Sequence, residues 1–122
     1  MAQIDRAYVG LAIALLIVGE LLGFYMGMVN DTKWRGVHIV IVLVGFVTIA
    51  LFGVVYRLWP AMRDGSLAAA QFWLTIVGVM GVIVGSIVQV QNGSIVILAV
   101  SSAVMIVGTL LLGWLFWERA RA

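Results

Sequence analysis

Four long apolar runs, separated by short polar segments, follow one another along the chain. They cover roughly residues 7–29, 36–59, 67–90 and 94–117, and each is about as long as the ~20 residues that an α-helix needs to cross the hydrocarbon core of a bilayer. Within each run the apolar residues are nearly continuous rather than alternating, which favours a helix surrounded by lipid over a half-buried strand. The pattern predicts an all-α fold in which residues 1–122 form one domain, an antiparallel bundle of four transmembrane helices.

The composition supports the same class of protein. Of the 122 residues, 65% are hydrophobic and only 10% are charged, which is more apolar surface than a soluble domain of this size is able to bury. We therefore expect an integral membrane protein in contact with the lipid bilayer. The net charge of +2 is small and spread along the chain, so no nucleic-acid partner is indicated.

Reactive side chains are scarce. The chain has no cysteine, which excludes disulfides, thiolate metal sites and cysteine nucleophiles. No nucleophile is paired with a base in the sequence, so a hydrolase or transferase is not indicated. A transporter or channel is also disfavoured, because no inverted repeat and no row of polar residues runs through the apolar segments. The sequence favours a function other than catalysis.

Basic residues are distributed unequally between the two sides that this topology creates. The side that holds both ends of the chain and the loop after the second run has Arg6, Arg57, Arg63, Arg119 and Arg121, whereas the other side has Lys33 and Arg35. By the positive-inside rule, both termini are expected in the cytoplasm. The expected location is the cytoplasmic membrane, which is the inner membrane of a Gram-negative bacterium.

Aromatic residues lie near both boundaries of the predicted bundle. The outer boundary has Tyr25 and Trp34, and the inner boundary has Tyr8, Tyr56, Trp59, Trp114 and Trp117. Amphipathic rings gather where headgroups meet the hydrocarbon. We therefore expect these residues to form two belts at the membrane interfaces.

Glycines recur at close spacing in two of the predicted helices. The first run has Gly19, Gly23 and Gly27, and the third has Gly78, Gly81 and Gly85. Stripes of small residues allow two helices to approach closely, so these glycines are predicted to be helix-packing positions. The partner in each case is either another helix of the same chain or a neighbouring protomer in a homo-oligomer.

Glu20 is the only carboxylate within an apolar run. A carboxylate inside a membrane costs several kcal/mol unless it is neutral, paired or hydrated, so it is expected to be buried in the bundle. Three interpretations stay open. Glu20 forms a structural hydrogen bond with Ser101, Ser102 or Ser86, has a role in proton or ligand binding, or bonds across a subunit interface.

Other polar residues within the runs are scattered in depth. They are Gln71, Thr75 and Gln89. Hydrogen bonds between helices explain them better than a polar pathway, because no second acid or histidine completes a proton relay.

His38 is the only histidine of the chain and lies two residues inside the second run. It is either an interfacial residue bonded to a headgroup or to Asp31, or an axial ligand of haem iron. A site for another metal is disfavoured, because zinc or copper requires three or four strong donors. If haem is bound, the second axial position is open, is filled by His38 of a second copy, or is filled by Met26 or Met28, both weak candidates.

The sequence around His38 resembles a known helix. Asp31-Thr32 precede His38, Gly45 follows it, and the segment closes with Gly53, Tyr56 and Pro60. This spacing is similar to that of a haem-ligand helix in the catalytic subunit (subunit I) of the haem-copper oxidases and in their small stand-alone four-helix relatives. Two shorter segments, Leu22-Gly23-Phe24-Tyr25-Met26-Gly27 and Gln71-Phe72-Trp73-Leu74, are similar to the neighbouring helices.

The departures from that family limit what the resemblance implies. Val40 stands where the family has a second histidine, Val42 where the small relatives often have asparagine, and Gln71 where they commonly have histidine. Only His38 corresponds to a family ligand, that of the oxygen-binding haem, so haem b is the cofactor that the resemblance implies. The copper-ligating histidines lie on helices that this chain lacks. The resemblance therefore does not extend to dioxygen reduction by this chain alone.

Two functions follow from these observations. The favoured one is a non-catalytic integral membrane subunit or accessory protein of a respiratory-type complex, with other membrane subunits or a second copy as partners. Its motivation is the replacement of ligands by valine, a residue that packs well between apolar helices. The alternative is a b-type haem protein that transfers electrons or senses a gas, with His38 as the axial ligand.

Overall fold

A computed structural model describes residues 3–120, and within that range helices are joined by short turns, with no strand. The elements are α1 (Ile4–Val29), α2 (Arg35–Val40), the π-helix η1 (Ile41–Thr48), α3 (Ile49–Leu58), the short 3₁₀-helix η2 (Pro60–Arg63), α4 (Ser66–Asn92) and α5 (Val96–Arg119). The segments α2, η1 and α3 follow one another without a break and form one span, Arg35–Leu58. The described residues therefore contain four helices that are long and apolar enough to cross a membrane, as predicted. Arg121 lies outside the described residues.

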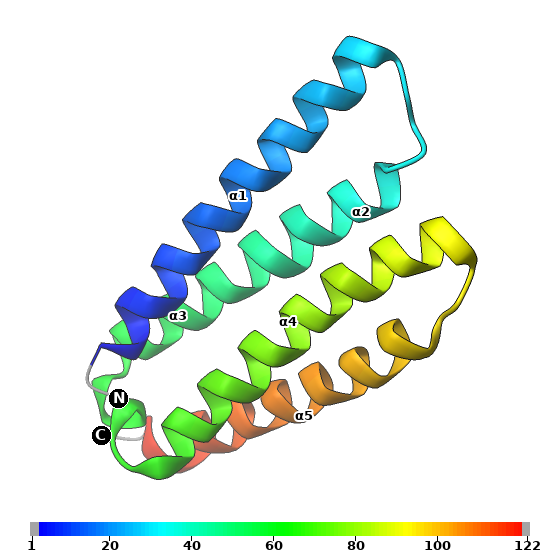
Figure 1. The fold of residues 1–122 in the computed structure, drawn as a ribbon. Coiled ribbons are helices and arrows are strands. Elements are labelled where there is room, and N and C mark those ends of the chain that lie inside the picture. The colour runs from blue at the N-terminus through cyan, green and yellow to red at the C-terminus, as the bar shows by residue number, and fades with distance from the viewer. Residues whose placement is uncertain (1–2, 121–122) are drawn as a thin grey trace.

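The spans form two hairpins (Figure 1). In the first hairpin α1 packs along η1 and α3, and in the second α4 packs along α5. The two hairpins meet mainly where α4 contacts α2 and η1. Both described chain ends lie at the same end of the bundle as η2, which we call the proximal end, and the other end is the distal end.

The tight distal turns use residues that tolerate a left-handed backbone. Asn30 ends α1 with φ 52°, and Gly93 ends α4 with φ 77°. Asparagine and glycine are the residues that adopt this region at least cost. The Asp31 carboxylate accepts a hydrogen bond from the Lys33 amide at 2.9 Å, which stabilises the turn into the second span.

The glycine stripes identify the helix that each span packs on. A Cβ added to Gly19 would lie 2.8 Å from a methyl carbon of Val42, and one added to Gly23 would lie 3.0 Å from Cε1 of His38. The partner of this α1 stripe is thus the second span of the same chain. Gly27, also expected at a packing position, has nothing within 4 Å of an added Cβ, because α1 continues beyond the close contact.

The stripe on α4 is occupied by α5. An added Cβ at Gly78 would lie 2.9 Å from the Cα atom of Met105, and one at Gly85 would lie 2.6 Å from that of Leu98. At Gly81 the nearest residue is Ser101. The α4 stripe therefore also has its partner within the chain.

Candidate functional site

Buried polar side chains gather at the proximal end of the bundle. Gln71 of α4 is fully buried, and its Oε1 accepts hydrogen bonds from the hydroxyls of Tyr8 at 2.6 Å and Tyr56 at 2.9 Å. Its Nε2 donates to Oγ1 of Thr75 at 2.9 Å and to the carbonyl oxygen of Gly108 at 3.1 Å. Because these residues lie on α1, α3, α4 and α5, one amide side chain links all four spans. We call Gln71 and its partners the glutamine node.

The glutamine node is fully satisfied. A primary amide has two donor hydrogens and an acceptor oxygen with two lone pairs, and Gln71 uses all four. No buried side-chain nitrogen or oxygen among residues 3–120 is left without a partner. The interhelical hydrogen bonds that the sequence predicts for Gln71 are thus present, whereas Gln89 is exposed.

Aromatic rings surround the glutamine node. Tyr8 stacks on Tyr56 at a centroid distance of 5.8 Å and meets Phe72 edge-on at 4.9 Å. Both tyrosines have no exposed surface. The expectation that they belong to an interfacial belt is therefore wrong, because a tyrosine hydroxyl placed inside the bundle needs a polar partner and Gln71 supplies it. Trp114 and Trp117 do lie on the surface.

An ion-pair cluster lies next to the node. The carboxylate of Asp5, in the first turn of α1, is 3.3 Å from Nη1 of Arg57 and 3.4 Å from Nη1 of Arg63. The Asp5 side chain is only 5% exposed, whereas that of Arg57 is 74% exposed. An acidic residue in the first turn of a helix also interacts favourably with the helix dipole. This cluster joins the start of α1 to the end of the second span.

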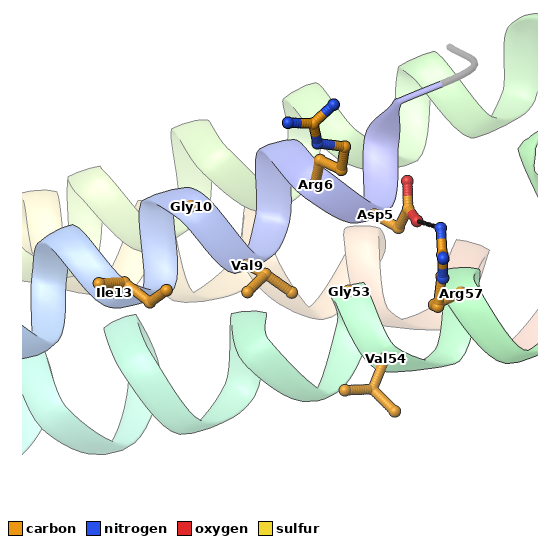
Figure 2. A pocket seen from close by; sticks show the side chains of 8 residues that line it. All are labelled: Asp5, Arg6, Val9, Gly10, Ile13, Gly53, Val54 and Arg57. Carbon is orange, nitrogen blue, oxygen red and sulfur yellow. Dashed lines mark hydrogen bonds and ion pairs between the residues drawn. The ribbon is translucent and has the colours of Figure 1, made fainter.

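A groove opens beside the ion pair, between α1 and α3 (Figure 2). Its volume is about 520 Å³. Eight residues line it: Asp5, Arg6, Val9, Gly10, Ile13, Gly53, Val54 and Arg57. The charged residues lie at the proximal end of the groove, and its remaining wall is apolar or glycine.

His38 lies towards the distal end, between the first two spans. Its Nδ1 is 2.9 Å from the carbonyl oxygen of Gly19, and because a carbonyl only accepts, Nδ1 is the donor. In the neutral ring this leaves the lone pair on Nε2. The half-buried ring lies against Gly23, where an added Cβ would be 3.0 Å from Cε1 of the ring. His38 thus bonds to a backbone carbonyl of α1.

The turn that follows His38 is wider than an α-helix. Residues Ile41–Thr48 form a π-helix, and the hydroxyl of Thr48 donates to the carbonyl oxygen of Leu43 at 3.0 Å. Gly45, within this segment, lies against Leu15 of α1. π-Helical turns are rare and are found frequently at functional sites, and the apolar sequence gave no indication of this one.

The two methionines considered for haem differ in their exposure. Met28 is 71% exposed, and Met26 is half-buried. No group of three or more histidine, cysteine, aspartate or glutamate side chains lies close enough to hold a metal ion in the described part of the chain. Of the donors considered, Nε2 of His38 is the one that would form an axial bond to haem iron.

Glu20 is exposed on the outer face of α1, and the expectation that it is buried is wrong. Gly19 is in contact with the second span, and the next residue is turned by about 100° around the helix, which takes Glu20 away from that contact. It makes no hydrogen bond to Ser101, Ser102 or Ser86. The first two are half-buried, and the hydroxyl of Ser86 instead donates to the carbonyl oxygen of Val82 at 2.8 Å.

Sequence reasoning did not find the cluster around Asp5. The available signal was the position of Asp5 itself, an acid at the start of one predicted helix, with arginines at the end of the next. The same topology that places these basic residues on one side also places them beside Asp5. The groove between α1 and α3 had no signal in the sequence, because it depends on how the two helices cross.

The chain matches no known protein-family model, no curated protein and no solved structure. The resemblance to the haem-copper oxidases therefore rests on the residues quoted for it alone.

Proposed function

We propose that the protein is an integral membrane protein and serves as a non-catalytic subunit or accessory protein of a larger membrane complex. Its four helices cross the bilayer, and both termini lie in the cytoplasm. The observation that carries the proposal is the position of Glu20, an exposed carboxylate on a helix long enough to span the membrane. The respiratory-type complex remains the favoured setting, supported only by the resemblance around His38.

The argument rests on the cost of exposing Glu20 to lipid. It lies sixteen residues after Ile4 in a helix of 26 residues, hence about 24 Å along a helix about 39 Å long. An acidic side chain near the middle of a membrane helix costs about 2.5–3.5 kcal/mol on insertion scales. A polar group from a partner helix would remove most of that cost. The outer face of α5 is also not covered by another helix of this chain, since only three residues of α5 are buried, Gly108, Leu112 and Leu115.

Photo-crosslinking in native membranes tests this proposal. Ile17 and Phe24 lie three residues before and four residues after Glu20, so they share its face of α1, and they are 52% and 69% exposed. A photoreactive amino acid at either position is expected to give a discrete protein adduct that disappears with Glu20→Leu. The mass of the adduct distinguishes a different subunit from a second copy of this chain.

The matched control is a photoreactive residue at Leu51, which is 58% exposed and lies on α3 rather than on α1. It is expected to give lipid adducts. Lipid adducts alone at all three positions would contradict the proposal that a partner helix covers Glu20.

A second candidate function is haem binding through His38. The favouring observation is the Nδ1 bond to Gly19, since histidines that ligate metals usually donate their other ring N–H to a carbonyl or carboxylate. When bound, haem would supply electron transfer or gas binding at its iron. His38 would hold the iron through Nε2, and Gly19 would fix the ring in the required tautomer.

Reduced-minus-oxidised absorption spectra of protein expressed with ample haem test this candidate, with and without carbon monoxide. Haem bands that disappear with His38→Ala and persist with Gln89→Ala, an exposed polar control, are the expected result. Colourless protein would contradict the cytochrome interpretation. Bands that survive His38→Ala would exclude His38 as the ligand.

A further inference from the structure

The groove between α1 and α3 combines two features that no part of the proposed function uses. Its wall is formed by Val9, Ile13 and Val54, which are 36%, 51% and 47% exposed. The volume of about 520 Å³ lies within the range of ~300–1,000 Å³ common for ligand sites. In a bilayer this groove faces the lipid, and its apolar length suits a hydrocarbon chain.

The charges at the proximal end of the groove favour an anion. Among the residues that line it, Arg6 and Arg57 contribute two positive charges there and Asp5 contributes one negative charge, which leaves a surplus of one. Arg6 is exposed and makes no ion pair with any residue in the range 3–120. Arg57 uses one guanidinium nitrogen for Asp5, and since a guanidinium has five N–H donors, others remain for a second anion.

The positions of the basic rim and the apolar wall match those of the headgroup and the acyl chain of a phospholipid. The rim lies at the end of both helices, where headgroups would be, and the wall extends from there towards the middle of the spans (Figure 2). Basic pockets between transmembrane helices are known to bind anionic headgroups. A partner helix in the groove would have to pass the exposed arginines, whereas an acyl chain with a phosphate would engage both features.

We propose that this groove binds one anionic phospholipid, with an acyl chain along Val9, Ile13 and Val54 and the phosphate on Arg6 and Arg57. The site rests on the proposed function only in that the helices must cross a bilayer. Asp5 orients Arg57 at the rim, because the ion pair holds the guanidinium beside the start of α1.

Gly10 offers a direct way to test the site. It lines the groove, and a Cβ there would meet nothing within 4 Å. Gly10→Leu should therefore fill the groove without disturbing the packing of the helices. Gly113 on α5 is also exposed with nothing within 4 Å of an added Cβ, so Gly113→Leu is the matched control.

Native mass spectrometry of the full-length chain in detergent, with equal amounts of phosphatidylglycerol and phosphatidylcholine, measures the preference. We expect each chain to retain one phosphatidylglycerol molecule, and the retained amount of this lipid to be about tenfold that of phosphatidylcholine. Arg6→Gln should lower its retention about fivefold, the effect of one basic residue at a lipid surface. Gly10→Leu should abolish it, whereas Gly113→Leu and Arg35→Gln, at the distal end, should leave it unchanged.

Two readouts separate the failure of this site from failure of the proposed function. Alkaline extraction of membranes tests whether the chain is integral, and a chain released by it would overturn both proposals. Two results would overturn the phospholipid site alone, in a chain that resists extraction. One is equal retention of the two lipids by the wild type, and the other is retention of phosphatidylglycerol by the Gly10→Leu variant. Either result would leave the groove available to a partner helix. The melting curve of each variant in detergent is expected to match the wild type, because neither Gly10 nor Arg6 packs against another span.

Discussion

The two hairpins of this bundle are both closed by glycines, but the glycines face different atoms. In the second hairpin Gly78 and Gly85 lie against the backbone of α5, with Cα atoms 2.9 and 2.6 Å from where a Cβ would stand. In the first hairpin Gly19, Gly23 and Gly45 lie against side chains, and only Gly53, at the proximal end, also comes close to backbone, with the Asp5 carbonyl oxygen 3.1 Å from an added Cβ. His38 occupies the space at Gly23, and Leu15 occupies the space at Gly45.

This difference bears on which hairpin is able to adjust. A side chain moves to another rotamer at modest cost, whereas a backbone moves only with its whole helix. The seam of the second hairpin is thus expected to be rigid at Gly78 and Gly85. The first hairpin has an adjustable seam, and it is the one that contains the histidine, the π-helix and the groove.

The largest expected effect comes from a side chain placed in the rigid seam. Gly85→Leu must separate α4 from α5, because the Leu98 backbone nitrogen and Cα lie within 2.6 Å of the new Cβ. We expect a loss of about 3 kcal/mol or more, at the upper end for overpacked cores. Unfolding of the purified protein in mixed micelles measures it, and Gly113→Leu, in open space on the same hairpin, should be neutral. Equal stabilities of the two variants would refute the tight seam.

A smaller loss is expected when the link between the hairpins is cut. Gln71→Leu removes the hydrogen bonds to Tyr8, Tyr56 and Gly108, and interhelical bonds average ~0.6 kcal/mol each in membrane proteins, so we expect about 2 kcal/mol. Adding Tyr8→Phe should cost little more, because its hydroxyl is then already without a partner. The same unfolding assay applies, with exposed Gln89→Leu as the control. If the losses of unfolding free energy caused by the two substitutions were strictly additive, the hydrogen bonds of Tyr8 and Gln71 would not be shared.

The smallest effect is expected in the adjustable seam. The three atoms nearest to a Cβ at Gly23 all belong to the His38 ring. We therefore expect Gly23→Leu to lower the free energy of unfolding by about 1 kcal/mol. The double variant with His38→Ala should recover most of it, since the obstacle is then gone. Gly27→Leu, with nothing within 4 Å, is the control. A loss as large as that of Gly85→Leu would show that the two seams do not differ.

The sequence by itself determined the four spans. Their number and approximate ends follow from uninterrupted apolar runs, and the observed boundaries of α1, α4 and α5 lie within three residues of the predicted ones. Local information is sufficient here, because a helix satisfies its own backbone hydrogen bonds and only apolar side chains tolerate lipid. The spacing of the glycines predicted close helix packing, and the polar side chain of Gln71 within an apolar run predicted a hydrogen bond between helices, although not its partners.

Only the tertiary structure decided which faces meet. Glu20 was expected inside and lies outside, while Tyr8 and Tyr56 were expected at the membrane interface and lie inside. In a helix that is apolar on nearly all sides, the sequence contains no amphipathic stripe to mark the inward face. The rotation of each helix is set instead by close packing and by the few polar bonds that the neighbouring helices complete. For that reason the glutamine node, the Asp5 ion pairs and the groove beside them appeared only when the four helices were placed together.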